Sequence, residues 1–176
     1  MKRLEDYVVS IPDFPEEGII FRDVTSILED AEGLHLSIEM MEERLKDKDF
    51  NIVVGPESRG FMFACPVANK IGKGFVPVRK KGKLPRETVS YTYELEYGTD
   101  TLFMHKDSIK KGQRVVICDD IVAIGGTLNA TAKMIEELGG VVAGMICLIG
   151  LTSLPGVKKL EKYNLKCLML NDVKDD

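Results

Sequence analysis

The feature that most constrains the fold of this 176-residue chain is an alternation of short, uniformly apolar segments with helix-like patterns. The strand candidates are residues 51–55, 74–78, 114–118, 141–149 and 166–170. Apolar side chains at spacings of three and four predict helices over residues 32–49, 58–71 and 127–138. Strands that are apolar on both faces are typical of a parallel sheet covered by helices. The sequence therefore predicts an α/β fold with a mostly parallel central sheet flanked by helices.

Length, charge and cysteine usage narrow the class of protein. A chain of this length usually forms one domain, here residues 1–176. The net charge of −4 argues against a nucleic-acid partner, and no apolar run is long enough to span a membrane. The first residues lack the apolar core of a signal peptide, and the four cysteines, which form no C-x-x-C pair, are expected to be buried reduced thiols. We therefore expect a cytoplasmic protein with neither a nucleic-acid nor a membrane partner.

The most informative segment is residues 115–127, with the sequence VVICDDIVAIGGT. An apolar strand ends in two acids, Asp119 and Asp120, and a glycine-containing turn then begins a helix. We call this turn the glycine loop; it comprises Ala123, Ile124, Gly125, Gly126 and Thr127. Backbone amides at a helix N-terminus bind phosphate, and carboxylates accept hydrogen bonds from sugar hydroxyls or help to hold a metal. The segment predicts a ribose 5-phosphate site; the alternative is an ordinary helix cap beside two solvated acids.

Cationic residues follow two other predicted strands, at the edge of the sheet where ligands bind in such folds. Arg59 lies at the start of a predicted helix, where its charge opposes the helix dipole and therefore suggests an external anion. Its alternative is a surface ion pair with Glu57. Residues 79–83 carry four cations in five positions, which indicates either an anion site or a solvated, nucleic-acid-like patch.

Together these segments resemble a known family. The 119–127 segment is similar to the phosphoribosyl-diphosphate (PRPP) signature of type I phosphoribosyltransferases, and the surrounding motifs are similar to those of adenine phosphoribosyltransferases. These motifs are IPDF (11–14), GIIFRDVT (18–25), GPESRGF (55–61), RKKGKLP (79–85) and LEYG (95–98). They occur in the family's order over most of the chain, so they are more specific than the PRPP signature alone.

The resemblance implies purine salvage, in which the 5-phosphoribosyl group of PRPP is transferred to adenine to give AMP and pyrophosphate. It implies Mg²⁺ held mainly through PRPP and water, with no direct protein ligand, and a homodimer. It also implies a small N-terminal base-binding hood at residues 1–30 and a flexible catalytic loop at 84–105. Two alternatives are a 6-oxopurine phosphoribosyltransferase acting on hypoxanthine, guanine or xanthine, and a PRPP-sensing regulator with the same fold. The FRD and LEYG motifs favour adenine.

The resemblance also implies roles for individual residues. The glycine loop binds the 5-phosphate, and the pyrophosphate contacts Ser58, Arg59, Arg79, Lys80 and Lys83. The base contacts Ile20, Phe21, Arg22 and Ile121. The catalytic residues are Glu96, Arg59, Asp119 and Asp120, and Tyr97 belongs to the mobile loop. Glu96 would handle the N7 proton of adenine. On the alternative interpretation, Glu96 is a solvated carboxylate and Phe21 a core residue.

One position departs from the family pattern. Ile124 stands where the family usually has a threonine whose hydroxyl contacts the 5-phosphate. Isoleucine offers only its backbone amide, and a hydrogen bond to a charged group contributes about 1.5–3 kcal/mol. We therefore expect weaker phosphate binding than in a chain with threonine at this position, without loss of activity.

Overall fold

A five-stranded parallel sheet forms the centre of the computed structural model, which describes residues 1–174. In spatial order the strands are β4 (Gly74–Val78), β3 (Ile52–Pro56), β7 (Arg114–Val122), β8 (Val141–Leu151) and β9 (Leu165–Asn171). This confirms the predicted fold class and all five strand candidates. The main difference is in β7, which continues through both acids as far as Val122 and does not end at Cys118.

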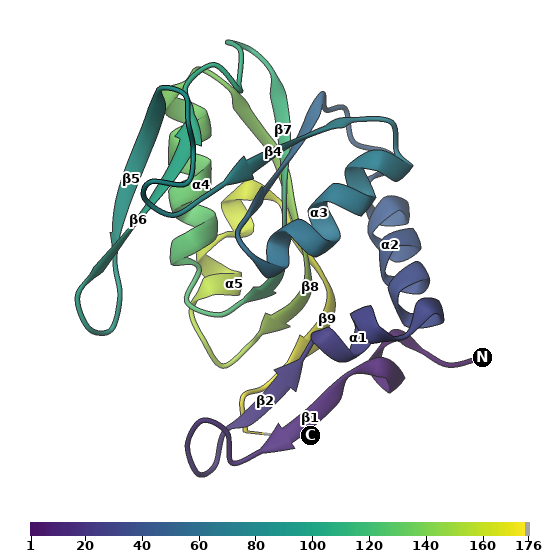
Figure 1. Cartoon of the computed structure of the whole chain (residues 1–176). Coiled ribbons are helices and arrows are strands. Elements are labelled where there is room, and N and C mark those ends of the chain that lie inside the picture. The colour runs from purple at the N-terminus through teal and green to yellow at the C-terminus, as the bar shows by residue number, and fades with distance from the viewer. Residues whose placement is uncertain (175–176) are drawn as a thin grey trace.

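Helices cover both faces of this sheet, as Figure 1 shows. On one face, α2 (Ala31–Leu45) and α3 (Arg59–Lys70) enclose a hydrophobic cluster that includes Met41 and Phe63. On the other face, α4 (Gly126–Glu137) encloses a second cluster that includes Met134. The remaining helical segments are short: η1 (Leu4–Tyr7), α1 (Thr25–Glu29), α5 (Gly156–Lys159) and η2 (Glu161–Tyr163).

Two details of the helix predictions were wrong. The helix expected from residue 32 begins at Ala31, where the Asp30 side chain caps it, and it already ends at Leu45. In α3 the expected buried face included Cys65, but Cys65 is exposed and the face is rotated towards Phe63 and Val67. Because α3 is apolar on most of its circumference, spacing alone does not choose its buried face; packing on the sheet does.

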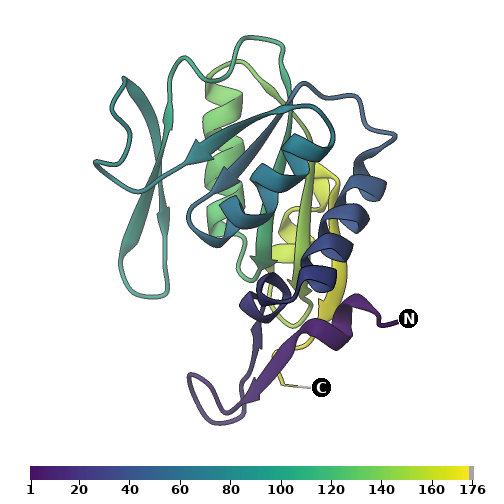
Figure 2. The ribbon, with the colours of Figure 1, turned by 45° about the vertical axis from the view of Figure 1, so that its right-hand side comes forward.

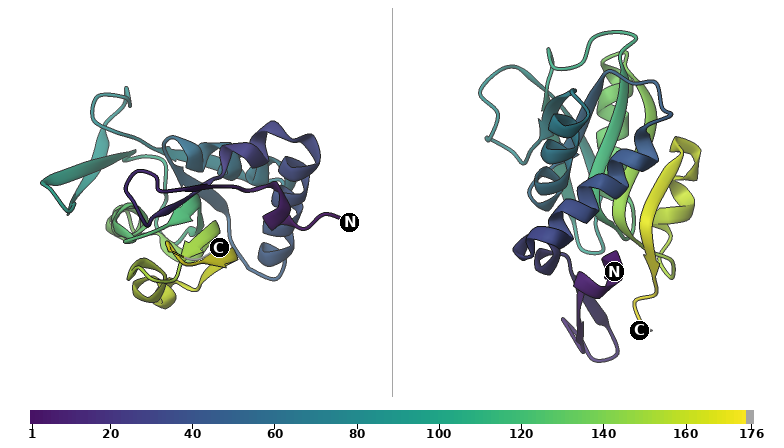
Figure 3. Two further views of the ribbon diagram at one scale, coloured as in Figure 1. Left: turned by 90° about the horizontal axis from the view of Figure 1, so that it is seen from below. Right: turned by 90° about the vertical axis from the view of Figure 1, so that its right-hand side faces the viewer.

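Two antiparallel hairpins project from the sheet and its helices. One joins β1 (Val9–Pro12) to β2 (Ile20–Asp23), and the other joins β5 (Thr88–Glu94) to β6 (Thr99–His105). The second hairpin confirms the excursion expected at residues 86–105, whereas the N-terminal strands were not anticipated. Figure 2 shows the N-terminal hairpin at the end of the molecule where β9 also ends, and Figure 3 shows β5–β6 projecting sideways.

The burial of the cysteines and the length of the helices bear on two expectations from the sequence. Cys118 and Cys147 are buried, Cys167 is partly buried and all four cysteines are free thiols, so only Cys65 departs from the expected burial. None of the helices within residues 1–174 combines the length and apolar character that crossing a bilayer requires.

Candidate active site

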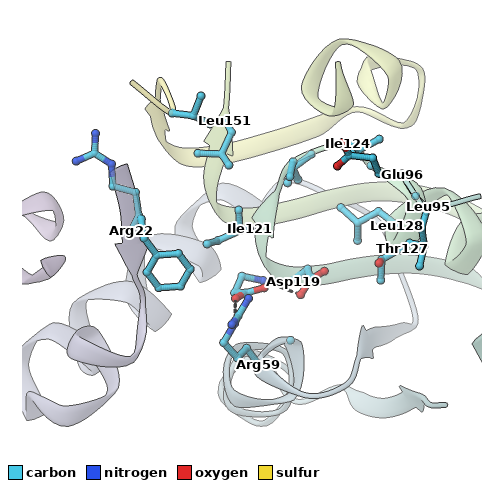
Figure 4. Close-up of a pocket in the computed structure, with 18 of the residues that line it drawn as sticks. Arg22, Arg59, Leu95, Glu96, Asp119, Ile121, Ile124, Thr127, Leu128 and Leu151 are labelled. Atoms are coloured by element: carbon cyan, nitrogen blue, oxygen red, sulfur yellow. Dashed lines mark hydrogen bonds and ion pairs between the residues drawn. The ribbon is translucent and has the colours of Figure 1, made fainter. Parts of the chain in front are cut away.

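A cavity of about 630 Å³ opens at the carboxyl ends of β3 and β7, between the N-terminal hairpin and the tip of the β5–β6 hairpin. Figure 4 shows its lining side chains. Residues expected at the site from the sequence make up much of this lining: Ile20, Phe21, Arg22, Ser58, Arg59, Glu96, Asp119, Asp120, Ile121 and the whole glycine loop. The fold therefore brings together segments that lie about 100 residues apart in the chain.

The acid pair, Asp119 and Asp120, lies at the centre of this lining. Because β7 continues through both residues, they are only 7% and 5% exposed. Nε of Arg59 donates to Oδ2 of Asp120 at 2.5 Å, so Arg59 pairs with the acids rather than with Glu57. Burial, reinforced by the neighbouring Asp120 charge, raises the pKa of Asp119 well above its usual range.

A close approach of two elements positions the acid pair and Arg59. The first turn of α3 runs beside β7, and a Cβ on Gly60 would lie 2.8 Å from Oδ1 of Asp119. Only glycine fits at this distance without displacing the carboxylate. The Arg59 side chain therefore begins within reach of Asp120 because the next residue has no side chain.

The glycine loop turns between β7 and α4, and all five of its residues line the cavity. Gly125 adopts φ 89°, a left-handed conformation that favours glycine, and precedes the first helical residue. The loop is braced from behind: Gly156 donates its backbone N–H to the Ala123 carbonyl at 2.9 Å. Ile124 is 53% exposed at the cavity and contributes an apolar side chain there. This arrangement suits an anion bound by amides at the start of α4.

The N-terminal hairpin and the C-terminal segment form the opposite wall. The Phe21 ring packs edge-to-face against Phe14, with centroids 5.2 Å apart and planes at 73°. The backbone N–H of Ile20 donates to the Val173 carbonyl at 2.7 Å. Arg22 is buried and donates to Oγ of Ser10 at 2.5 Å. In Figure 4 its guanidinium points away from the acid pair.

Four of the expected site residues are not brought into the cavity lining. Nε of Arg79 lies 3.4 Å from the Glu57 carboxylate, and Nζ of Lys80 is hydrogen-bonded to Asp100 of β6. Lys83 is exposed, and Tyr97 at the hairpin tip is 88% exposed. Arg79 and Lys80 were expected to face a ligand, but each is paired with an acid of the chain itself.

Several lining residues were missed by the sequence reasoning. They are Ile19, Glu57, Gly60, Tyr93, Glu94, Leu95, Val122, Leu128, Leu151 and Val173. Tyr93 could have been found from the sequence, because it lies in the expected excursion and shares one face of β5 with Val89 and Tyr91, at intervals of two residues. Leu151 and Val173 carried no signal, since only the sheet and the C-terminal segment bring them to the cavity.

Comparison with known proteins agrees with this geometry. A family model described as the phosphoribosyl transferase domain matches residues 23–175, and the chain belongs to that family. Within the family it groups with the adenine phosphoribosyltransferases. The enzyme of that name from Lachnoclostridium phytofermentans is 59% identical over 94% of this chain and 95% of its own, and that from Agathobacter rectalis is 55% identical over 99% and 100%.

Solved structures agree as well. The crystal structure of adenine phosphoribosyltransferase from Thermoanaerobacter pseudethanolicus superposes with a TM-score of 0.91, at 51% identity, over 96% of this chain and 99% of that one. The Saccharomyces cerevisiae enzyme, solved with adenine and an imino-altritol bisphosphate, superposes with a TM-score of 0.82, at 35% identity, over 97% and 96%.

Proposed function

We propose that this protein transfers the 5-phosphoribosyl group of PRPP to adenine, giving AMP and pyrophosphate, and so serves purine salvage. The observation that carries the proposal is the cavity, which places a buried acid pair, an arginine and a helix N-terminus around one space. Relatives named adenine phosphoribosyltransferase at 51–59% identity support adenine as the base. These three kinds of group suit phosphoribosyl transfer, because a ribose, a 5-phosphate and a leaving pyrophosphate each need a partner.

In this proposal the glycine loop binds the 5-phosphate and the acid pair binds the ribose. Amides at the start of α4 and the Thr127 hydroxyl would donate to the phosphate. Asp119 and Asp120 would accept hydrogen bonds from the ribose hydroxyls. Since carbon 1 of the ribose becomes cationic in an oxocarbenium-like transition state, nearby carboxylates would also stabilise the developing charge.

The leaving pyrophosphate would contact Ser58 and Arg59, which lie at the start of α3. Arg59 would then share its guanidinium between Asp120 and the departing oxygens, which gain negative charge as the bond breaks. We also propose that Arg79, Lys80 and Lys83 reach the pyrophosphate. For Arg79 and Lys80 this requires exchanging their carboxylate partners for the ligand, because both are already ion-paired.

The base would lie between the N-terminal hairpin and β7. Phe21 would stack on one face of the purine and Ile121 would pack on the other, while Ile20 and Arg22 contact or order its edge. The Ile20 amide hydrogen is already bonded to Val173, so this residue has its carbonyl and side chain to offer. Glu96 would accept the N7 proton directly or through water.

We propose that Mg²⁺ takes part, held mainly by PRPP oxygens and water. Within residues 1–174 no three His, Cys, Asp or Glu side chains gather into a metal cage, whereas the adjacent carboxylates of Asp119 and Asp120 belong to the cavity lining. This donor set fits Mg²⁺, which keeps several waters and commonly binds through one or two carboxylates and substrate phosphates. When bound, the ion would neutralise charge on the pyrophosphate. Removal of Mg²⁺ with EDTA is expected to abolish AMP formation.

The organisation of the chain is part of the proposal. We propose a single domain over residues 1–176, with 1–30 as the base-binding segment and 84–105, including Tyr97, as a flexible catalytic loop. A cytoplasmic homodimer is proposed on the resemblance to the family and on the four free thiols. Sedimentation velocity of the purified protein tests the dimer.

The deciding experiment is a base competition. The purified protein is incubated with PRPP, Mg²⁺ and equimolar adenine, hypoxanthine, guanine and xanthine, and the nucleotide products are separated. AMP is expected to dominate. A double variant, Asp119→Asn with Asp120→Asn, should lower turnover by orders of magnitude, whereas Asp47→Asn, which changes an exposed acid, serves as the control. Dominant IMP, GMP or XMP, or no nucleotide at all, would refute the proposed reaction.

A further inference from the structure

Tyr93 of β5 links the β5–β6 hairpin to the glycine loop. A Cβ on Gly126 would lie 2.7 Å from Cδ2 of the Tyr93 ring, so the ring rests directly on the loop backbone. The Tyr93 hydroxyl lies 3.3 Å from Oγ1 of Thr127 and 3.3 Å from Oδ2 of Asp100. Figure 1 shows the two strands of this hairpin beside α4, which begins at Gly126.

The direction of these hydrogen bonds follows from the charge on Asp100. A hydrogen bond from Lys80 and another from the Thr101 amide lower the pKa of Asp100, so its carboxylate is ionised at neutral pH and only accepts. The single hydroxyl hydrogen of Tyr93 therefore goes to Asp100. Thr127 must then donate its own hydrogen to Tyr93, which leaves a chain of donors running from Thr127 through Tyr93 to Asp100.

A phosphate in the glycine loop competes for the same hydrogen. The other four residues of the loop, two glycines, Ala123 and Ile124, have no side-chain donor, so Thr127 supplies the loop's one hydroxyl. A phosphate oxygen there can only accept, and a hydrogen bond to a charged acceptor is stronger than one to a neutral tyrosine oxygen. Both bonds of Tyr93 are also long for hydroxyl groups, which makes them easy to replace.

The rest of the hairpin is anchored independently. Leu102 and Met104 of β6 are fully buried in the cluster beneath α4. In contrast, the side chains of the hairpin tip (residues 93–100) are mostly exposed. The Tyr93 contact and the ion pair between Lys80 and Asp100 therefore hold the tip, while the base of the hairpin is packed independently.

We propose that Tyr93 is a positioning residue that latches the hairpin tip to the glycine loop, and that a ribose 5-phosphate group releases this latch by taking the Thr127 hydrogen. The inference rests on the proposed function in that the glycine loop binds the 5-phosphate. Because Asp100 belongs to this tip, its movement would carry the carboxylate away from Lys80 and make that cation available to the pyrophosphate end of PRPP. Binding of one end of the substrate thereby prepares the site for the other.

Affinity for ribose 5-phosphate tests the latch without any catalysis. Tyr93→Phe removes the competing acceptor and keeps the ring on Gly126, so calorimetry should show binding about two- to fivefold tighter than in the unaltered protein. Tyr91→Phe, on the same face of β5 but outside the cavity lining, is the matched control and should leave the affinity unchanged. In a Thr127→Val background, Tyr93→Phe should have no further effect, because the shared hydrogen is absent.

Movement of the tip is measured with a single tryptophan, since the chain has none of its own. In Thr99→Trp, which changes an exposed residue of the tip, ribose 5-phosphate should lower the fluorescence anisotropy. Adding Tyr93→Phe should give the low value without ligand. Three affinity results would overturn the latch: no binding of ribose 5-phosphate by the unaltered protein, unchanged or weaker binding by Tyr93→Phe, or tighter binding by Tyr93→Phe that persists in the Thr127→Val background. An anisotropy that ribose 5-phosphate leaves unchanged would also overturn it. Failure of AMP formation with these results intact would refute the proposed reaction alone.

Discussion

Replacing Asp119 by asparagine should stabilise the folded protein at neutral pH while it slows the reaction. Asp119 is nearly fully buried beside a second carboxylate, and both burial and that neighbour raise its pKa. Asparagine has the same shape and no charge to desolvate. Its oxygen can still accept the Asp120 amide, which lies 2.8 Å from Oδ1, and its NH₂ group can donate to the Asp120 carboxylate.

The magnitude follows from proton linkage. In the unfolded chain the Asp119 carboxyl titrates near its ordinary pKa of about 3.9. Because its pKa is raised in the folded state, Asp119 keeps its proton in the folded protein at pH values where the unfolded chain has already lost it. The free energy of unfolding therefore falls with rising pH, by at most about 1.36 kcal/mol per pH unit for one proton. The penalty is absent below about pH 4 and constant above the raised pKa.

Urea unfolding of the unaltered protein and of Asp119→Asn, from pH 4.5 to pH 8, measures this difference. The variant's advantage should grow as pH rises towards the raised pKa of Asp119, with an unchanged dependence on urea, while AMP formation falls in the same samples. Asp13→Asn, at an exposed position, should run parallel to the unaltered protein. If Asp119→Asn also ran parallel, or were less stable at pH 7, the buried carboxyl would carry no electrostatic penalty and the argument would be wrong.

Three further changes test the walls of the cavity. Ile124→Thr adds a hydroxyl at the loop and should lower the KM for PRPP about tenfold, from a bond to a charged group, whereas an unchanged KM would refute the phosphate-contact argument. Gly156→Ala would place a methyl 2.3 Å from the Ala123 carbonyl oxygen of the glycine loop. It should lower the free energy of unfolding in urea by about 1–3 kcal/mol and weaken ribose 5-phosphate binding. The control Gly74→Ala, whose methyl would have its nearest neighbour at 3.7 Å, should change neither the stability nor the binding. Phe14→Ala removes the edge-to-face support of Phe21 and should raise the KM for adenine about two- to tenfold, with the KM for PRPP unchanged; equal changes in both would argue for a general structural role.

Much of the sheet and of the ribose side of the site could be predicted from the sequence, because both depend on local patterns. Five apolar runs separated by helical periods can bury themselves only as a covered parallel sheet. The same logic placed Asp119 and Asp120 at the carboxyl end of a strand, next to a loop whose glycines free the backbone amides. The acid pair and the glycine loop are within nine residues of each other, so no long-range contact was needed to relate them.

Other features depended on contacts that no local pattern encodes. Residues 79–83 carry the expected cations, but whether Arg79 and Lys80 face a ligand or an internal acid depends on Glu57 and Asp100, which the fold brings from other elements. The buried face of α3 was likewise settled by the sheet, since the helix is apolar on several sides.

The sequence by itself determined the parallel sheet, the succession of its strands and helices along the chain, and the chemical groups available at one edge. Only the tertiary structure decided which of those groups share a space, because a side chain's partner is chosen by distance in three dimensions. Tyr93 shows this most clearly: along the chain it is an ordinary strand tyrosine, and in the fold its hydroxyl lies between Thr127 and Asp100. Val173 reaches the cavity only because the chain after β9 returns to β2.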